Sequence, residues 1–188
     1  MCILSRSKLN CVVTKYLKHL NFNDLKSQEE LFIKMVLNAW DDHVKKMNNL
    51  FTSLSDEQFM TEIAPGRNRG IYLLGHMAAV HDRMLPLLGL GEQLNADMYK
   101  IFVENPDKFI VQLPAIADLK DYWTNVNTTL SNYFSNLTPA EWFQKHNSVS
   151  EEDFANEPYR NKLNVIINRT NHIASHLGQL TYLMPKEE

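Results

Sequence analysis

The chain has 188 residues, of which 44% are hydrophobic and 22% charged, and its formal net charge at pH 7 is -3. This size and balance are typical of one globular domain, with or without a short appendage. The slightly acidic charge argues against the basic surface that holds a nucleic-acid backbone, and no apolar run approaches the roughly 20 residues of a membrane span. We therefore expect neither a nucleic-acid nor a membrane partner.

Residues 1–27 are expected to form an N-terminal extension, helical or loosely ordered, ahead of a single domain over 28–188. Charged residues interrupt every apolar run of this extension, which argues against a secretory signal. The two cysteines, Cys2 and Cys11, form neither a CxxC pair nor a disulfide framework. Because a fold without disulfides favours a reducing compartment, we expect a cytoplasmic protein.

Helix signals dominate the remaining sequence. Ser27 and Glu30 match a capping box, which predicts that a long amphipathic helix over 28–52 begins there. A second capping box at residues 55–58 predicts a short helical turn. After a loop over 64–70, the spacing of apolar residues predicts a second long helix over 69–89.

The second half of the chain continues the helical pattern. Residues 91–113 are expected to form a loop with short helical pieces, and a third long helix is predicted over 115–135. Thr138, Pro139 and Glu141 predict a short helix that ends near His146. A polar linker over 148–152 and a last long helix over 157–183 complete the predicted elements.

Four long helices, with no alternating strand pattern between them, predict an all-α fold, specifically a four-helix bundle with long connections. Metal sites in such bundles are built from side chains on facing helices. The most informative residues for such a site are the histidines.

His172 and His176 are four residues apart, so on a helix their rings project from the same face one turn apart. His76 lies on the apolar stripe of the second long helix. If these two helices touch, three neutral imidazoles meet and could hold one divalent metal ion, with a coordination position left open for chemistry. Ile173 stands where the HExxH motif has its general-base glutamate, which excludes a protease mechanism of that type at this helix.

Each of these histidines alone has a simpler explanation, as a core residue that is hydrogen-bonded to its neighbours. The metal hypothesis gains weight because three partly buried rings need partners, and one cation satisfies all three. Four other side chains are candidates for supporting the ligands from behind: His43, His81, Asp82 and Gln179. Gly75 and Gly178 would permit a close approach of helices at the metal, although ordinary tight packing explains them equally well.

The segments Leu74-Gly75-His76-Met77 and His172 to Gln179 resemble the motifs of the DinB/YfiT-like family of metal-dependent proteins. In that family one histidine follows Leu-Gly on the second helix, and two follow the pattern H-x-x-x-H-x-G-Q on the last. The resemblance covers about residues 28–184. Ser175 and Leu177 depart from it, since many members have histidine and arginine at these positions, which flank the ligands.

The resemblance implies a four-helix bundle with His76, His172 and His176 as metal ligands. Imidazole ligands suit zinc, nickel, copper and iron alike, of which we favour zinc or nickel, and we expect no catalytic residue beyond the ligands. It also implies an enzyme that binds a low-molecular-weight thiol as a metal-bound thiolate and transfers it to an electrophilic small molecule. By analogy with similar bundles, the protein is expected to form a homodimer. Two alternatives stay open: a metal-dependent hydrolase that uses bound water, and a non-catalytic bundle for ligand binding or stress response.

Overall fold

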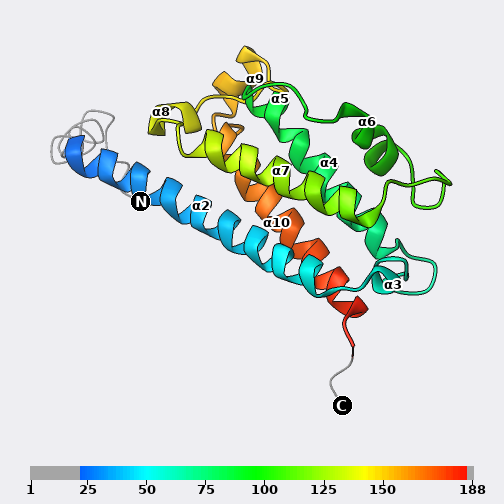
Figure 1. Ribbon diagram of the computed structural model, residues 1–188. Helices are drawn as coiled ribbons and strands as arrows, with labels where there is room; N and C mark the ends of the chain where they lie inside the picture. The colour runs from blue at the N-terminus through cyan, green and yellow to red at the C-terminus, as the bar shows by residue number, and fades with distance from the viewer. Residues whose placement is uncertain (1–21, 186–188) are drawn as a thin grey trace, which may run out of the picture.

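The computed structural model describes residues 22–185, with side chains from residue 28 onward. Its frame consists of four helices: α2 (Phe22–Ser53), α4 (Gly70–Asp82), α7 (Ile116–Phe134) and α10 (Lys162–Leu180). α2 packs against α10, and α4 packs against both α7 and α10 (Figure 1). No β-strand occurs in residues 22–185, so the predicted all-α class is confirmed.

Shorter elements lie in the connections between these four helices. They are α3 (Asp56–Phe59), α5 (Met84–Leu88), α6 (Ala96–Tyr99), the π-helical turn η1 (Lys100–Glu104), α8 (Pro139–Trp142), α9 (Glu151–Asn156) and the 3-10 turn η2 (Thr181–Leu183). α6 and η1 pack beside α4, while α8 and α9 lie at the end of the molecule away from α3 (Figure 1). No helix in the described range is both long and apolar enough to cross a membrane.

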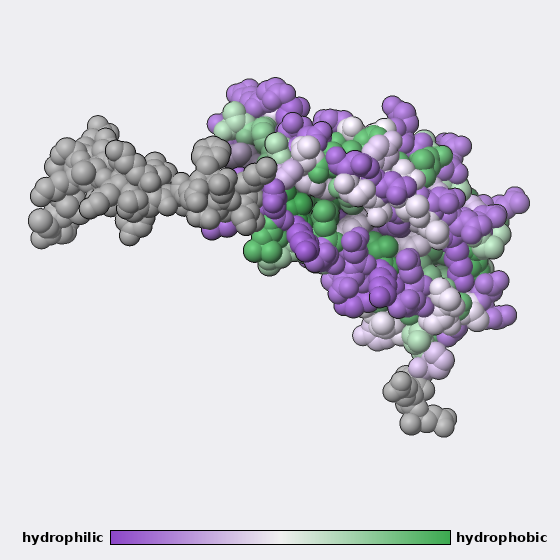
Figure 2. Space-filling view, turned by 60° about the vertical axis from the view of Figure 1, so that its left-hand side comes forward, coloured by the Kyte–Doolittle hydropathy of each residue, from purple (hydrophilic) through white to green (hydrophobic). Residues whose placement is uncertain are grey.

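The hydrophobic core fills the space between the four long helices. Trp40 and Met47 on α2 are seven residues apart, which places both on the inner face of that helix, and both are buried. Leu74 on α4, Leu130 on α7 and Ile173 on α10 are also fully buried. On the face drawn in Figure 2, hydrophilic residues dominate and hydrophobic ones appear in separate patches. The core therefore holds the facing sides of α4 and α10 together.

The start of the first long helix differs from the prediction. α2 already includes Phe22, so Ser27 lies within the helix and is not its N-cap. The predicted capping box at Ser27 is therefore wrong, because the helical pattern continues upstream of it. The predicted boundary between the extension and the domain falls inside α2 and stays a prediction, and Cys2 and Cys11 lie outside the described residues.

The second long helix is interrupted where the sequence predicted continuity. α4 ends at Asp82, and α5 begins at Met84. Pro86 explains the break, because its ring clashes with the carbonyl of the residue four positions earlier, which is Asp82, and it has no N–H to donate. The end at Gly89 is as predicted, and Gly89 has a left-handed conformation with φ of 70°.

Two of the predicted capping boxes are present. Ser55 caps α3 with Gln58, and Thr138 caps α8 with Glu141, in both cases through reciprocal hydrogen bonds. α8 is nevertheless shorter than predicted, because it ends at Trp142 and not near His146.

The predicted polar linker over 148–152 is partly helical. Ser150 caps α9 by accepting a hydrogen bond from Asp153 N, 3.0 Å away. The last long helix begins at Lys162, later than the predicted residue 157, and Asn161 is its N-cap. Its side chain accepts from Asn164 N at 2.9 Å. Both starts follow the preference of Ser and Asn for the N-cap position.

The connection that contains α6 and η1 is fastened to the start of α4. The Arg69 guanidinium donates to both carboxylate oxygens of Asp107, with Nη2 at 2.7 Å from Oδ1. Tyr72 donates its hydroxyl hydrogen to the carbonyl of Asn105 at 2.7 Å. Because both partners follow η1 directly, these bonds fix η1 beside the middle of α4, where His76 lies.

Candidate metal centre

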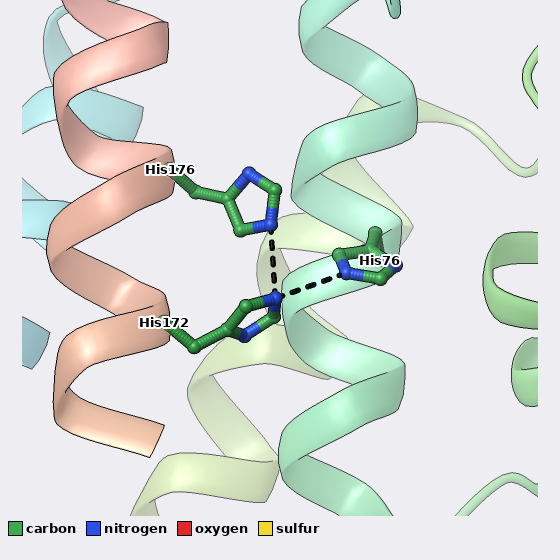
Figure 3. A group of neighbouring side chains, drawn as sticks. All are labelled: His76, His172 and His176. Atoms are coloured by element: carbon green, nitrogen blue, oxygen red, sulfur yellow. Dashed lines mark hydrogen bonds between the residues drawn. The ribbon is translucent and has the colours of Figure 1, made fainter. Parts of the chain in front are cut away.

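Three histidines from two helices meet at one point between α4 and α10. His76 on α4 faces His172 and His176 on α10 (Figure 3). Nε2 of His172 lies 3.3 Å from Nε2 of His76 and 2.9 Å from Nε2 of His176. Ligand nitrogens of all three lie within 4.8 Å of one another, so the group could hold a metal ion. The fold thus brings together the residues that the sequence assigned to one site.

Neighbouring core residues hold these rings in place. His76 sits between buried Leu73 and Met77 on α4, and buried Ile173 and Leu180 attach α10 to the same core. The three histidines themselves are only partly buried. The three rings are therefore supported by the core on one side and are not fully buried.

The outer nitrogens of two of the rings have acceptors. His76 Nδ1 donates to the carbonyl oxygen of Phe102 in η1 at 2.9 Å, and His176 Nδ1 donates to Gln179 Oε1 at 2.8 Å. A hydrogen on Nδ1 leaves Nε2 with a lone pair, which is the state that ligates a metal. Nδ1 of His172 is buried and has no hydrogen-bond partner among the described residues.

The arrangement of these lone pairs favours a shared cation. The lone pairs on Nε2 of His76 and His176 both face Nε2 of His172. A hydrogen on His172 Nε2 can serve only one of them, so at least one of the two close contacts has no hydrogen between its nitrogens. Nitrogens bound to tetrahedral zinc at about 2.0–2.1 Å are themselves about 3.3 Å apart, which is close to the spacing here. The donor set therefore fits a divalent ion.

Burial also keeps the three imidazoles in the neutral form that binds metals. It is the main cause that lowers the pKa of His172 to about 3, and the charges of His176, His76 and Arg169 lower it further. Burial likewise lowers the pKa values of His76 and His176, while their bonds to Phe102 and Gln179 act in the opposite direction. Near pH 7 no proton therefore competes with a metal at these rings.

Replacement of Gln179 by leucine is expected to weaken metal binding about 10- to 100-fold, because it removes the acceptor that orients the His176 ring. Zinc titration calorimetry measures the change. Gln179→Glu keeps an acceptor at the same place and serves as the control, with affinity near that of the parent. Equal affinity of the leucine variant and the parent would show that Gln179 has no orienting role.

His81 and Asp82, two of the candidates for supporting the ligands, are both fully buried in the core. The His81 ring lies between Trp40 and Trp123, with both centroid distances 4.7 Å. Its Nδ1 donates to Asn127 Oδ1 at 2.9 Å, and its Nε2 is a buried acceptor without a partner among the described residues. His81 and Asp82 lie in the core together with their apolar neighbours, because α4 is covered on nearly all sides.

Asp82 connects α4 to the segment before α6. Its carboxylate accepts hydrogen bonds from Leu94 N at 2.8 Å, from Asn95 N at 3.0 Å and from the Tyr122 hydroxyl at 2.7 Å. Three donors compensate the cost of burying the charge. Asp82 therefore has a structural role at the end of α4, and none of its bonds reaches the three histidines.

His43, the remaining candidate for supporting the ligands, bonds within its own helix. Its Nδ1 donates to the carbonyl of Ala39 at 2.8 Å, and the ring is partly exposed on α2. No hydrogen bond joins it to the three histidines in the described range. Gln179 is thus the only one of the four candidates that contacts a histidine of the cluster through a hydrogen bond in residues 22–185.

Acid is expected to destabilise the metal-free protein because of His81, whose burial lowers its pKa to about 3. A histidine with a lower pKa in the folded than in the unfolded state adds stability above pH 6.5. This stability is lost towards pH 3, because only the unfolded chain takes up the proton. Between about pH 5.5 and 4, one such histidine contributes about 1.4 kcal/mol per pH unit to the slope of the unfolding free energy.

Urea unfolding in the presence of a chelator, at several pH values, measures this slope. For His81→Gln, the unfolding free energy is expected to change with pH by about 1.4 kcal/mol per pH unit less than in the parent, whatever its absolute stability. This difference corresponds to one proton fewer taken up on unfolding. Identical slopes for the two proteins would mean that His81 is protonated equally in the folded and unfolded states.

The two glycines near the ligands have different surroundings. A Cβ atom on Gly75 would lie 2.5 Å from the Phe102 ring, so a close approach is required there, with η1 as the neighbour. A Cβ atom on Gly178 would meet nothing within 4 Å, so the explanation by close packing is wrong for Gly178. The carbonyl of Phe102 is the contributor that sequence reasoning missed, since a backbone acceptor in a π-helical turn leaves no signature in side-chain patterns.

Comparison with known proteins agrees with this geometry. No curated protein matches the chain. The model of the DinB superfamily matches residues 39–180, from the middle of α2 to the last residue of α10, and this range contains all three histidines. Since the match spans well over half of the sequence, the protein belongs to the DinB superfamily.

Proposed function

We propose that His76, His172 and His176 hold a divalent metal ion, with zinc or nickel favoured, and that the protein transfers a low-molecular-weight thiol to an electrophilic small molecule. The observation that supports the metal most strongly is the pair of Nε2 to Nε2 separations, 2.9 Å and 3.3 Å, which join His172 to two rings whose Nδ1 atoms already donate to Gln179 and Phe102. A bound ion supplies an undiminished +2 charge, because all three ligands are neutral, and it favours coordination of a thiol as the thiolate.

The residues around the site support thiol transfer over hydrolysis. No Asp or Glu side chain is hydrogen-bonded to the three histidines in the described range, whereas hydrolysis calls for a general base that activates the bound water. A thiol needs no such base, because its pKa of about 8.5 is already close to neutral. In the proposed reaction the sulfur forms a bond to an electrophilic carbon, the leaving group departs with its electron pair, and the thiol proton goes to solvent.

The cellular setting is part of the same proposal. A reducing, cytoplasmic compartment, favoured by the absence of a cysteine framework, keeps a small thiol in its reduced form. A homodimer is proposed only by analogy with bundles of this kind, and gel filtration with light scattering tests it.

The test of the proposed function is metal-dependent formation of a thioether. Protein reconstituted with zinc or nickel is incubated with a panel of small thiols and 1-chloro-2,4-dinitrobenzene, and the products are identified by mass spectrometry. We expect product above the uncatalysed background that disappears after chelation. Turnover of esters or amides without any thioether would support the hydrolase, and stoichiometric metal without turnover of either kind would support a binding bundle.

A further inference from the structure

Arg169 lies on the same side of α10 as the two histidines of that helix. It precedes His172 by three residues and His176 by seven. At 100° per residue, these steps place its side chain about 60° from His172 and about 20° from His176 around the helix axis. Side chains with this spacing are neighbours along the helix surface, so Arg169 stands one turn from the candidate metal centre.

The guanidinium of Arg169 has no partner among residues 22–185. Its Nε is buried without a hydrogen bond, and neither an ion pair nor a side-chain hydrogen bond is formed. The other partly buried arginines contrast with it, because Arg69 pairs with Asp107 and Arg160 pairs with Glu157. A buried, unpaired donor of an always charged group is costly, which indicates that a ligand group completes the site.

The charge of Arg169 reaches the candidate metal centre. Burial is the main cause that lowers the pKa values of His76 and His172, and the guanidinium charge adds to the effect in both. A divalent ion held there would add two positive charges beside the one of Arg169, with no carboxylate bonded to either. An anionic ligand is the simplest way to compensate three positive charges in a partly buried site.

We propose that Arg169 binds a carboxylate of the substrate, so that the protein selects small thiols carrying a carboxylate a few bonds away from the sulfur. The inference rests on the proposed function, which places the thiol sulfur at the metal. The planar guanidinium matches a carboxylate through two parallel hydrogen bonds. Because only one helical turn separates Arg169 from His172, the carboxylate must be close to the sulfur in the ligand, as it is in 3-mercaptopropionate.

Cobalt(II)-loaded protein tests the proposal without any assay of turnover, because a thiolate bound to cobalt produces a sulfur-to-metal charge-transfer absorption. The parent is titrated with 3-mercaptopropionate and with its methyl ester, which has the same thiol but no charge. We expect the acid to bind at least tenfold more tightly than the ester. Arg169→Met is expected to remove this preference and Arg169→Lys to keep part of it, while the matched control Arg160→Met leaves it unchanged.

Equal affinity of the parent for acid and ester overturns the proposal, as does a preference that survives in Arg169→Met, and both results leave the proposed function intact. If neither thiol alters the cobalt spectrum, the proposed function fails, and thermal stabilisation of the same protein by propionate then decides about Arg169. Stabilisation that is lost in Arg169→Met supports the carboxylate site. No stabilisation, or a larger one by inorganic phosphate, overturns it.

Discussion

Replacement of His172 by alanine is expected to abolish stoichiometric metal binding and, with it, thiol transfer. His172 is the central member of the cluster, because its Nε2 is the atom close to both other rings. Two imidazoles alone leave a divalent ion with half of a tetrahedral ligand set. Loss of a direct ligand should exceed the 10- to 100-fold effect that is typical of losing a supporting residue. The metal content of dialysed protein, by elemental analysis, should fall from about one per chain to near zero.

Thermal unfolding gives an independent reading of the same change. A ligand that binds only the folded state stabilises it by about 2.7 kcal/mol at a concentration 100 times its dissociation constant. The parent should therefore gain melting temperature with added zinc, and His172→Ala should not. Ser175→Ala, at an exposed position of α10 between the two histidines, is the matched control and should behave like the parent. Full metal content in His172→Ala would reject the three-histidine site.

The histidine cluster could be predicted because the helices that carry it have clear periodic patterns, although each histidine alone has a simpler explanation. The four-residue step between His172 and His176 sets their geometry wherever the helix forms, and a tertiary contact is needed only to add His76. The apolar stripes of α4 and α10 allowed that contact, and the family resemblance implied it. The groups that orient the rings were harder to predict from the sequence, since the acceptor of His76 is the backbone carbonyl of Phe102. Its position depends on the Arg69 to Asp107 ion pair, which spans a loop without periodicity.

The differences elsewhere have equally specific causes. Burial of His81 and Asp82 could not be predicted from their polarity, because charged and polar residues are rarely fully buried unless they are paired. Here the partners come from distant segments of the chain, which the local sequence does not reveal. Those partners are Asn127 and Tyr122 on α7 and the backbone at Leu94. By contrast, the break of the helix after Asp82 could have been predicted, since a proline four residues later interrupts helical hydrogen bonding.

Gly75 and Gly178 provide a matched pair whose alanine variants should differ in sign. Both glycines are helical, so alanine gains up to about 1 kcal/mol of helix propensity at either position. At Gly178 nothing opposes this gain, and Gly178→Ala should be neutral or more stable than the parent. At Gly75 the new methyl would lie 2.5 Å from two atoms of the fully buried Phe102 ring. Overpacking of this kind costs about 1–3 kcal/mol, and the severe overlap favours the upper end.

The Gly75→Ala variant should also bind metal less tightly, and this second effect links packing to function. Relief of the overlap must move η1 away from α4, which draws the Phe102 carbonyl from His76 Nδ1. Loss of that orienting bond should weaken zinc binding about 10- to 100-fold. Urea unfolding and zinc calorimetry on both variants measure the two effects. Equal stability and equal zinc affinity of Gly75→Ala and Gly178→Ala would mean that η1 can move away from α4 without loss of stability. The idea that η1 holds His76 in a binding orientation would then be wrong.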